Sequence, residues 1–277
     1  MPEDFYFPAA PADSMALEWR FREIVKHLSE TERCKLYEIL AAMHSYFHRV
    51  DFTLEETVLL AHQEGQTIAF PRPLPIVKFS HLLCGYEHWL ERKYSLPGFL
   101  TVEDNDVVID CGAYVGGFSL SASKRARSLH AFEPETENFA CLTANLSGRQ
   151  NVILNQVGLY SASQTMDLNI SRSGVEHSLL TPDDGEVIER RPIEVISLKD
   201  YCIANKISVI DFLKLEAEGV ELEIFEGLGH LRPRKIAIDV SPEREGKSPA
   251  NDFLRQLGQL GYEIRQRGHV MFAKHAL

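Results

Sequence analysis

The feature that most constrains the fold is a short apolar run that leads into an aspartate and a glycine-rich turn. Residues 107–109 are apolar and lead into Asp110, and Gly112, Gly116 and Gly117 follow. Such a run is typical of a strand buried on both faces of a parallel sheet. Strand and helix patterns alternate from there to the end of the chain. This alternation predicts an α/β fold, a mostly parallel sheet with helices on both faces.

The hydrophobic periodicity also places the individual elements. Strands are expected at 107–109, 129–133, 152–154, 209–215, 235–240, 262–267 and 269–274, and helices from about 117 and near 136–146, 197–205, 220–229 and 249–260. The last two strands are joined by a tight turn, so one strand of the predicted seven, the last, should be antiparallel. The polar stretch 161–192 contains short alternating pieces and predicts an inserted hairpin.

The first 100 residues have a different, helical pattern. Apolar stripes at three- and four-residue steps predict helices at 15–29 and 30–48, and the segment 79–93 predicts one more helix, with an aromatic face. Thr53 and Glu56 resemble a capping box that opens another helix near 54–64. We therefore expect two domains, a helical N-terminal cap at 1–100 and a ligand-binding domain at 101–277. The cap would close the ligand site at the open end of the sheet, or form a dimer surface.

Composition and charge disfavour several classes of partner. The chain has 29 Lys and Arg against 40 Asp and Glu, a net charge of −11, which disfavours nucleic acid because phosphate binding needs a cationic surface. Five scattered cysteines without a CxxC pair indicate free thiols in a reducing compartment. The acidic start is unlike a secretory signal, and no apolar stretch approaches the roughly 20 residues of a membrane span. We expect a cytoplasmic protein without a membrane partner.

The turn after the first strand should lie in the ligand site, since open α/β sheets bind ligands at the carboxyl ends of their strands. Glu133 ends the second strand about 20 positions further on, where an acidic residue can bind two ribose hydroxyls. The turn lacks the middle glycine of the dinucleotide motif. Asp110 would repel a pyrophosphate but attract the cationic end of S-adenosylmethionine. These residues favour S-adenosylmethionine over NAD, and no P-loop motif for a nucleoside triphosphate is present.

Three blocks of the sequence resemble the signature blocks of the FkbM-type methyltransferases. They are VIDCGAYVGGFSL (108–120), AFEPETENFACLTANL (131–146) and DFLKLEAEGVELEIFEGL (211–228). The family's patterns read approximately D-x-G-A-N-x-G, F-E-P before an asparagine-containing helix, and D-x-x-K-[ILV]-D-x-E-G-x-E. The resemblance covers about 106–265. It implies a Rossmann-like class I methyltransferase sheet, S-adenosylmethionine as the cofactor, and a hydroxyl group of a sugar or natural product as the usual acceptor.

The resemblance also implies roles for single residues. The residues expected to contact the cofactor are Asp110, Gly112, Ala113, Tyr114, Gly116, Ser119, Glu133, Pro134 and Glu216. Of these, Asp110 and the glycines would line the methionine side, and Glu133 would hold the ribose. Two positions depart from the pattern. Tyr114 stands where asparagine is usual, and Glu216 stands where aspartate is usual, which moves its carboxylate outward by about 1.5 Å.

Transfer to a hydroxyl also requires a group that takes the hydroxyl proton. Lys214 and Glu216 are two apart on one strand, so they should point to the same side, and Asp239 ends the neighbouring strand. We expect Glu216 as the base or acceptor-binding acid, Asp239 as the second candidate, and Lys214 beside them. The alternative is a buried structural ion pair between Lys214 and Glu216. Glu216, Asp239 and Glu243 could offer oxygen ligands, but no spacing demands a metal, and none is expected.

The sequence therefore predicts an S-adenosylmethionine-dependent methyltransferase that methylates a hydroxyl of a small natural product or sugar. The stretch 216–219, EAEG, stands where nucleic-acid methyltransferases of this class often carry an N-P-P-Y-like block, which also favours a small molecule. N- or C-methylation, and a cofactor-binding scaffold that has lost its chemistry, remain alternatives. An NAD-dependent reductase is a weaker one. A homo-oligomer is compatible with the sequence.

Overall fold

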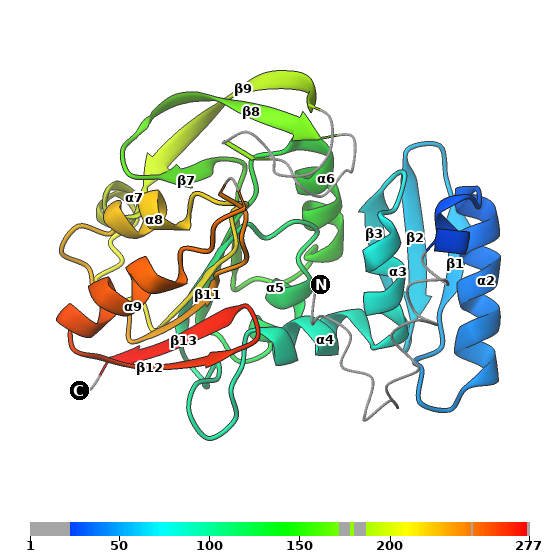
Figure 1. Cartoon of the computed structure of the whole chain (residues 1–277), viewed down its shortest axis with the longest axis horizontal. Coiled ribbons are helices and arrows are strands. Elements are labelled where there is room, and N and C mark those ends of the chain that lie inside the picture. Colours follow the sequence, from blue (N-terminus) through cyan, green and yellow to red (C-terminus); the bar gives the residue numbers. More distant parts are fainter. Residues whose placement is uncertain (1–22, 172–177, 180–186, 245, 276–277) are drawn as a thin grey trace. The chain divides into compact units, whose positions relative to one another are not determined.

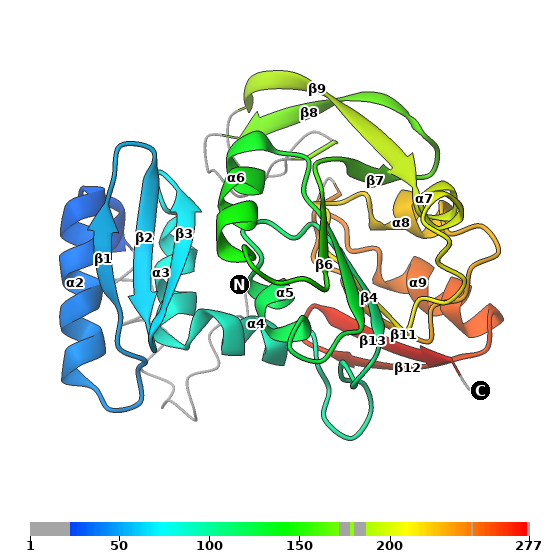
Figure 2. The same cartoon turned by 180° about the vertical axis from the view of Figure 1, so that it is seen from behind.

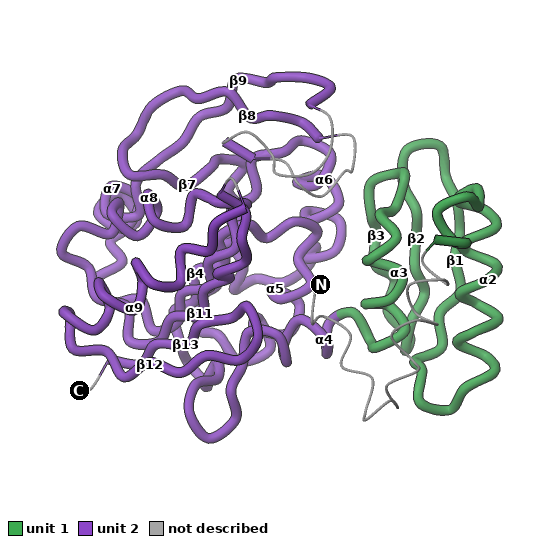
Figure 3. Tube along the Cα trace, in the orientation of Figure 1, with its two compact units in different colours: residues 1–86 green, residues 87–277 purple. Residues whose placement is uncertain are grey.

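The computed structural model describes residues 23–171, 178–179, 187–244 and 246–275. The chain divides into two compact units, Met1–Tyr86 and Glu87–Leu277 (Figure 3). The expected boundary at residue 100 thus lies inside the second unit. None of the helices formed by the described residues is long and apolar enough to cross a bilayer.

The described residues of the first unit combine helices with a small antiparallel sheet. Its elements are α2 (Glu30–Met43), β1 (Asp51–Leu54), β2 (Val58–Gln63), β3 (Gln66–Pro71) and α3 (Ile76–Leu83), with strand order β1-β2-β3. Ser29 and Glu32 form a capping box that begins α2, near the start of the expected helix 30–48. Tyr37 of α2 stacks on Phe79 of α3, with ring centroids 4.9 Å apart. Of the helix expected at 15–29, residues 15–22 lie outside the described residues and 23–26 are helical.

The helix expected near 54–64 is wrong, because these residues form the end of β1 and the strand β2. Along β2, buried side chains alternate with partly exposed ones, which is the period of a strand. Glu64 and Gly65 both have positive φ angles, +53° and +78°, and turn the chain back into β3. A two-residue turn with both φ angles positive is the hairpin connection that matches strand twist. The expected helix 79–93 is likewise split into α3 and α4 (Tyr86–Lys93), with Gly85 at φ +75° between them.

The second unit is built on a seven-stranded sheet with the order β12-β13-β11-β10-β4-β5-β6 (Figures 1 and 2). The strands are β4 (Val107–Cys111), β5 (Ser128–Phe132), β6 (Val152–Asn155), β10 (Phe212–Leu215), β11 (Lys235–Asp239), β12 (Tyr262–Arg267) and β13 (Val270–His275). Neighbouring strands from β6 to β11 are parallel, and β13 is antiparallel to both of its neighbours. The predicted mostly parallel sheet with an antiparallel last strand is confirmed.

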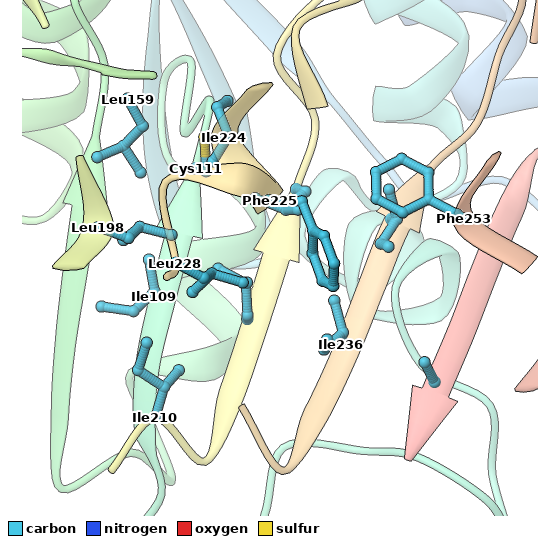
Figure 4. Close-up of a cluster of buried hydrophobic side chains, with 14 of the residues drawn as sticks. Ile109, Cys111, Leu159, Leu198, Ile210, Ile224, Phe225, Leu228, Ile236 and Phe253 are labelled. Carbon is cyan, nitrogen blue, oxygen red and sulfur yellow. The ribbon is translucent and has the colours of Figure 1, made fainter. Parts of the chain in front are cut away.

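Helices cover both faces of this sheet. They are α5 (Gly117–Ala122), α6 (Thr136–Asn145), α7 (Leu198–Ala204), α8 (Glu221–Glu226) and α9 (Ala250–Gln259). Figures 1 and 2 show α5 and α6 on one face and α7, α8 and α9 on the other. On the second face, strand residues such as Ile109 and Ile236 form one buried cluster with Leu198, Phe225 and Phe253 of the helices (Figure 4). Removal of this apolar surface from water is the main stabilising contribution to the unit.

The predicted inserted hairpin is confirmed and is longer than expected. It consists of β8 (Gln164–Ser171) and β9 (Val187–Ser197), which pair antiparallel. A third strand, β7 (Gly158–Tyr160), runs parallel to the end of β9. Arg191 of β9 forms an ion pair with the buried Glu135 at the start of α6, with Nη1 and Oε1 2.8 Å apart. This contact ties the insertion to the loop that follows β5.

Candidate active site

The strand order of the large sheet reverses at β4, which has β5 on one side and β10 on the other. Ligands of open α/β sheets bind outside the carboxyl ends of the strands at such a point. Gly112 follows β4 there with φ +68°, and a Cβ atom at this position would lie 1.7 Å from the carbonyl oxygen of Glu216. Only glycine lets the ends of β4 and β10 approach so closely. Gly112 therefore lets the loop after β4 approach the backbone of Glu216, the residue expected to act as the base.

Tyr114 occupies the left-handed region of backbone conformation, with φ +51°. Asparagine, which is usual at this position in the resembling family, enters that region at less cost than other side chains do. A tyrosine there carries strain of about 1 kcal/mol. Its backbone N–H donates to Oε2 of Glu133 over 2.9 Å, so the strained turn is held by the acid at the end of β5.

Glu133 lies at the carboxyl end of β5 and is almost fully buried. Its Oε1 accepts hydrogen bonds from the N–H of Glu135 at 3.0 Å and from the side-chain amide of Asn138 at 3.4 Å. Burial raises the pKa of Glu133 to about 7. The buried Oδ1 of Asn138 has no hydrogen-bond partner among the described residues. A carboxylate and an adjacent open acceptor suit the two hydroxyls of a ribose, so these residues fit the expected adenosine group.

Lys214 is a buried ammonium with two carboxylates beside it, and it meets Glu216 on the same side of the chain, as strand parity predicted. Its Nζ lies 3.2 Å from Oδ1 of Asp110 and 3.2 Å from Oε2 of Glu216, and donates to the carbonyl oxygen of Gly112 at 2.6 Å. Burial lowers the pKa of Lys214, but the two carboxylates more than offset this and raise it to about 12. Lys214 therefore stays charged and orients its partners.

Asp110 and Ser119 face each other inside the protein. Both are fully buried, and the Ser119 hydroxyl donates to Oδ2 of Asp110 over 2.6 Å. The other carboxylate oxygen, Oδ1, lies 3.2 Å from Nζ of Lys214 as an ion pair but accepts no hydrogen bond from the described residues. Asp110 thus links Ser119 to Lys214 inside the protein.

Lys93 is a member of the site that sequence reasoning missed. Its Nζ lies 2.7 Å from Oε1 of Glu216 and 2.9 Å from Oδ2 of Asp239. It therefore joins the two carboxylates that were expected to converge. Burial lowers the pKa of Lys93, but Asp239 and Glu216 outweigh this and hold it well above its usual value. No motif marks this lysine, because it comes from a helix that precedes the first strand of the sheet.

The side chains joined by these ion pairs form a charged cluster, and its members differ in accessibility. They are Lys93, Asp110, Lys214, Glu216 and Asp239. The side chain of Glu216 is 26% exposed, whereas those of Lys214 and Asp239 are 2% and 4% exposed. Asp239 also accepts hydrogen bonds from the N–H and the hydroxyl of Ser241. Further acids surround the cluster. Burial, with Glu218 and other carboxylates nearby, raises the pKa of Glu243 to about 10. Glu216 is thus the carboxylate of the cluster that an incoming molecule can reach most easily.

A sheet in this order, with a glycine turn after β4 and an acidic end to β5, is the arrangement that the resemblance to class I methyltransferases implies. Residues 110–264 match the family model described as the methyltransferase FkbM domain. The match spans more than half of the chain, and the protein belongs to the FkbM methyltransferase family. Its cofactor is S-adenosylmethionine. No curated protein sequence matches the chain.

Similar solved structures are distant. The precorrin-6y C5,15-methyltransferase of Geobacter metallireducens GS-15 is 15% identical, with 68% of this chain and 87% of that chain covered and a TM-score of 0.40. TYW2 of M. jannaschii, in complex with AdoMet, is 12% identical over 80% and 87% of the two chains, with a TM-score of 0.42. An rRNA methylase of Streptococcus thermophilus is 15% identical over 69% and 94%, with a TM-score of 0.37. These TM-scores are all below 0.5, and membership of the FkbM family is shown by the match over residues 110–264.

Proposed function

We propose that the protein transfers the methyl group of S-adenosylmethionine to a hydroxyl of a small molecule, a sugar or another natural product, and that Glu216 accepts the hydroxyl proton. The observation that carries the proposal is the placement of Glu216. It is the most exposed carboxylate of the cluster at the carboxyl end of β10, and its two oxygens are oriented by two different ammonium groups. Such orientation favours a near-attack geometry for the acceptor.

The bound cofactor supplies an electrophilic methyl group on a sulfonium. The chain's task is to hold the acceptor oxygen in line with it and to remove one proton. Once the new O–C bond begins to form, the hydroxyl becomes strongly acidic, so a carboxylate can accept its proton. Glu216 takes that proton, while Lys93 and Lys214 keep its carboxylate in place. Glu133 and Asn138 hold the ribose, and Asp110 acts through Lys214.

A small acceptor fits the charges of the site better than nucleic acid does. Carboxylates of Glu216, Glu218, Asp239 and Glu243 gather beyond the ends of β10 and β11, and their mutual repulsion contributes to the raised pKa of Glu243. Together with the net charge of −11, this disfavours a polyanion. N- or C-methylation of a small molecule is the second candidate. An amine acceptor can lose its proton after the transfer, so it would need Glu216 less.

The test is methyl transfer by the Glu216→Gln variant to a panel of hydroxylated sugars and phenols and a matched panel of amines. We expect kcat for the hydroxyl acceptors to fall by about 100-fold or more, since general-base catalysis contributes on this order. Cofactor affinity, measured by calorimetry, should change much less. Glu263→Gln is the matched control, because Glu263 is an exposed glutamate on β12. Methylation confined to amines, or an unchanged kcat in Glu216→Gln, would contradict the proposal.

Two further expectations from the sequence stay predictions. One is that the N-terminal region caps the acceptor pocket. The other is that Ala113, Pro134 and Gly116 contact the cofactor directly. Gly116 has φ +91°, a backbone conformation that favours glycine, and a Cβ atom there would lie 2.8 Å from a methyl carbon of Leu142 in α6.

A further inference from the structure

Lys93 lies outside the segment 110–264 that matches the family, yet it makes two of the shortest ion pairs of the site. Its Nζ bridges Glu216, at 2.7 Å, and Asp239, at 2.9 Å. These carboxylates come from the ends of two neighbouring strands, β10 and β11. The side chain of Lys93 is 18% exposed, so its ion pairs are shielded from water more than surface pairs are.

The helix that carries Lys93 is anchored within the second unit. Near its beginning, Glu87 forms an ion pair with Lys124. At its end, the guanidinium of Arg267 donates to the carbonyl oxygens of Arg92 and, at 3.2 Å, Lys93. A cation that binds the last carbonyls of a helix also interacts favourably with the helix dipole. The backbone of Lys93 is therefore held in place at the edge of the site.

The next residue, Tyr94, restricts the lysine side chain. Its buried ring lies close to two ammonium groups, with its centroid 5.1 Å from Nζ of Lys93 and 5.2 Å from Nζ of Lys214. The ring also packs edge-on against Phe118, at a centroid distance of 5.8 Å. Cations over a buried ring are stabilised by its quadrupole. Both lysines that orient Glu216 are thus fixed by one aromatic side chain.

We propose that Lys93 is a positioning residue for methyl transfer, which clamps Glu216 against Asp239 and sets the net charge beside the cofactor's sulfonium. The proposal rests on the proposed function of Glu216. The cluster holds three carboxylates, Asp110, Glu216 and Asp239, and two ammonium groups. Removing Lys93 deletes the ion pairs to Glu216 and Asp239, so the carboxylate of Glu216 is held less firmly toward the acceptor. It also makes the cluster more negative by one charge.

These two consequences can be measured separately. Loss of the clamp should lower kcat, because the base is held less well, and should change the acceptor KM little. The added negative charge should favour S-adenosylmethionine, with its cationic sulfur, over the demethylated product, whose sulfur is neutral. A defect that is only structural would weaken the binding of both molecules alike. The ratio of the two dissociation constants therefore distinguishes the proposed role from loss of structure.

The experiment compares four variants of the full chain: Lys93→Met, Lys93→Arg, the double variant Lys93→Met/Asp239→Asn, and Arg92→Met. The last is the matched control, an exposed cation on the same helix. Each is titrated by calorimetry with S-adenosylmethionine and with the demethylated product, and kcat and KM are measured with a hydroxyl acceptor.

In Lys93→Met we expect the preference for S-adenosylmethionine over the product to rise by about fivefold, and kcat to fall by about 10- to 100-fold. Lys93→Arg should keep most of the wild-type preference and most of the wild-type kcat. In the double variant, which restores the net charge without the clamp, the preference should return to the wild-type value while kcat stays low. Arg92→Met should behave like the wild type.

An unchanged preference and an unchanged kcat in Lys93→Met would overturn the proposal. An equal loss of affinity for both molecules, together with a lowered melting temperature, would also overturn it. The titrations need no acceptor, so they can be interpreted even if Glu216 is not the base. If Glu216 is not the base, Glu216→Gln keeps its turnover, while the preference of Lys93→Met for S-adenosylmethionine over the demethylated product still rises.

Discussion

Glu133 illustrates how burial of a single residue can couple cofactor binding to pH. The side chain is 6% exposed, and burial raises its pKa to about 7 even though three donors of the chain face it. Its ionised form is the stronger acceptor for ribose hydroxyls. Close to neutral pH, the free protein should therefore exist as a mixture of a better and a poorer binding form.

We expect affinity for S-adenosylmethionine to fall severalfold between pH 8 and pH 6. Binding favours the ionised carboxylate, so affinity is highest above the pKa of Glu133 in the free protein and decreases as the pH falls through it. Calorimetric titrations across this range would measure the effect. Glu133→Gln should bind more weakly and show a flatter dependence on pH. An equally steep dependence in that variant would assign the effect to another group, such as Glu221, whose pKa burial also raises to about 7.

The residues of the charged cluster were predictable where they follow from strand parity. Lys214 on β10 and Glu216 just after it point to the same side and form an ion pair, and Asp239, at the end of the neighbouring strand, joins Glu216 through Lys93. Lys93 was not predictable, because its contact with Glu216 spans 123 positions of sequence and begins on a helix outside the sheet. Parity rules apply within an element and between paired strands, and they give no information about such a helix.

Among the elements, helices and strands of the second unit follow their hydrophobic patterns closely. The elements of the first unit do so less well, since β2 lies in the segment 54–64, for which a plausible capping box predicted a helix. Short apolar runs fit both a helix and a strand, and the signal that decides here is the turn at Glu64 and Gly65. Gly85, with φ +75°, likewise separates α3 from α4.

The helix α9 offers a direct test of the packing that Figure 4 shows. Phe253 is fully buried and packs edge-on against Phe225, with ring centroids 5.5 Å apart, whereas the adjacent Leu254 is 44% exposed. We expect Phe253→Ala to lower the free energy of unfolding by about 3–5 kcal/mol. Leu254→Ala should change it by about 0.5 kcal/mol or less. Denaturant unfolding of both variants measures the difference, and similar losses in the two would contradict the described face of the helix.

For the whole molecule, the order of the strands is the property that composition and periodicity do not encode. The sequence indicates seven strands and alternating helices, but many sheets satisfy that pattern. The resemblance of the three blocks supplied the class I topology, and the structure has it, with β4 between β10 and β5 and with β13 antiparallel. The position of the site follows from that order, because Asp110, Glu133 and Glu216 come together only when β5, β4 and β10 are neighbours.

The most direct test of this account is a calorimetric titration of the purified full chain with S-adenosylmethionine, its demethylated product and NAD. We expect saturable binding of S-adenosylmethionine and of its demethylated product at one site per chain, and no binding of NAD. Binding should weaken in Glu133→Ala, since Glu133 and Asn138 supply the acceptors at the end of β5. Binding of NAD without binding of S-adenosylmethionine would contradict the assignment of the site and the chemistry derived from it.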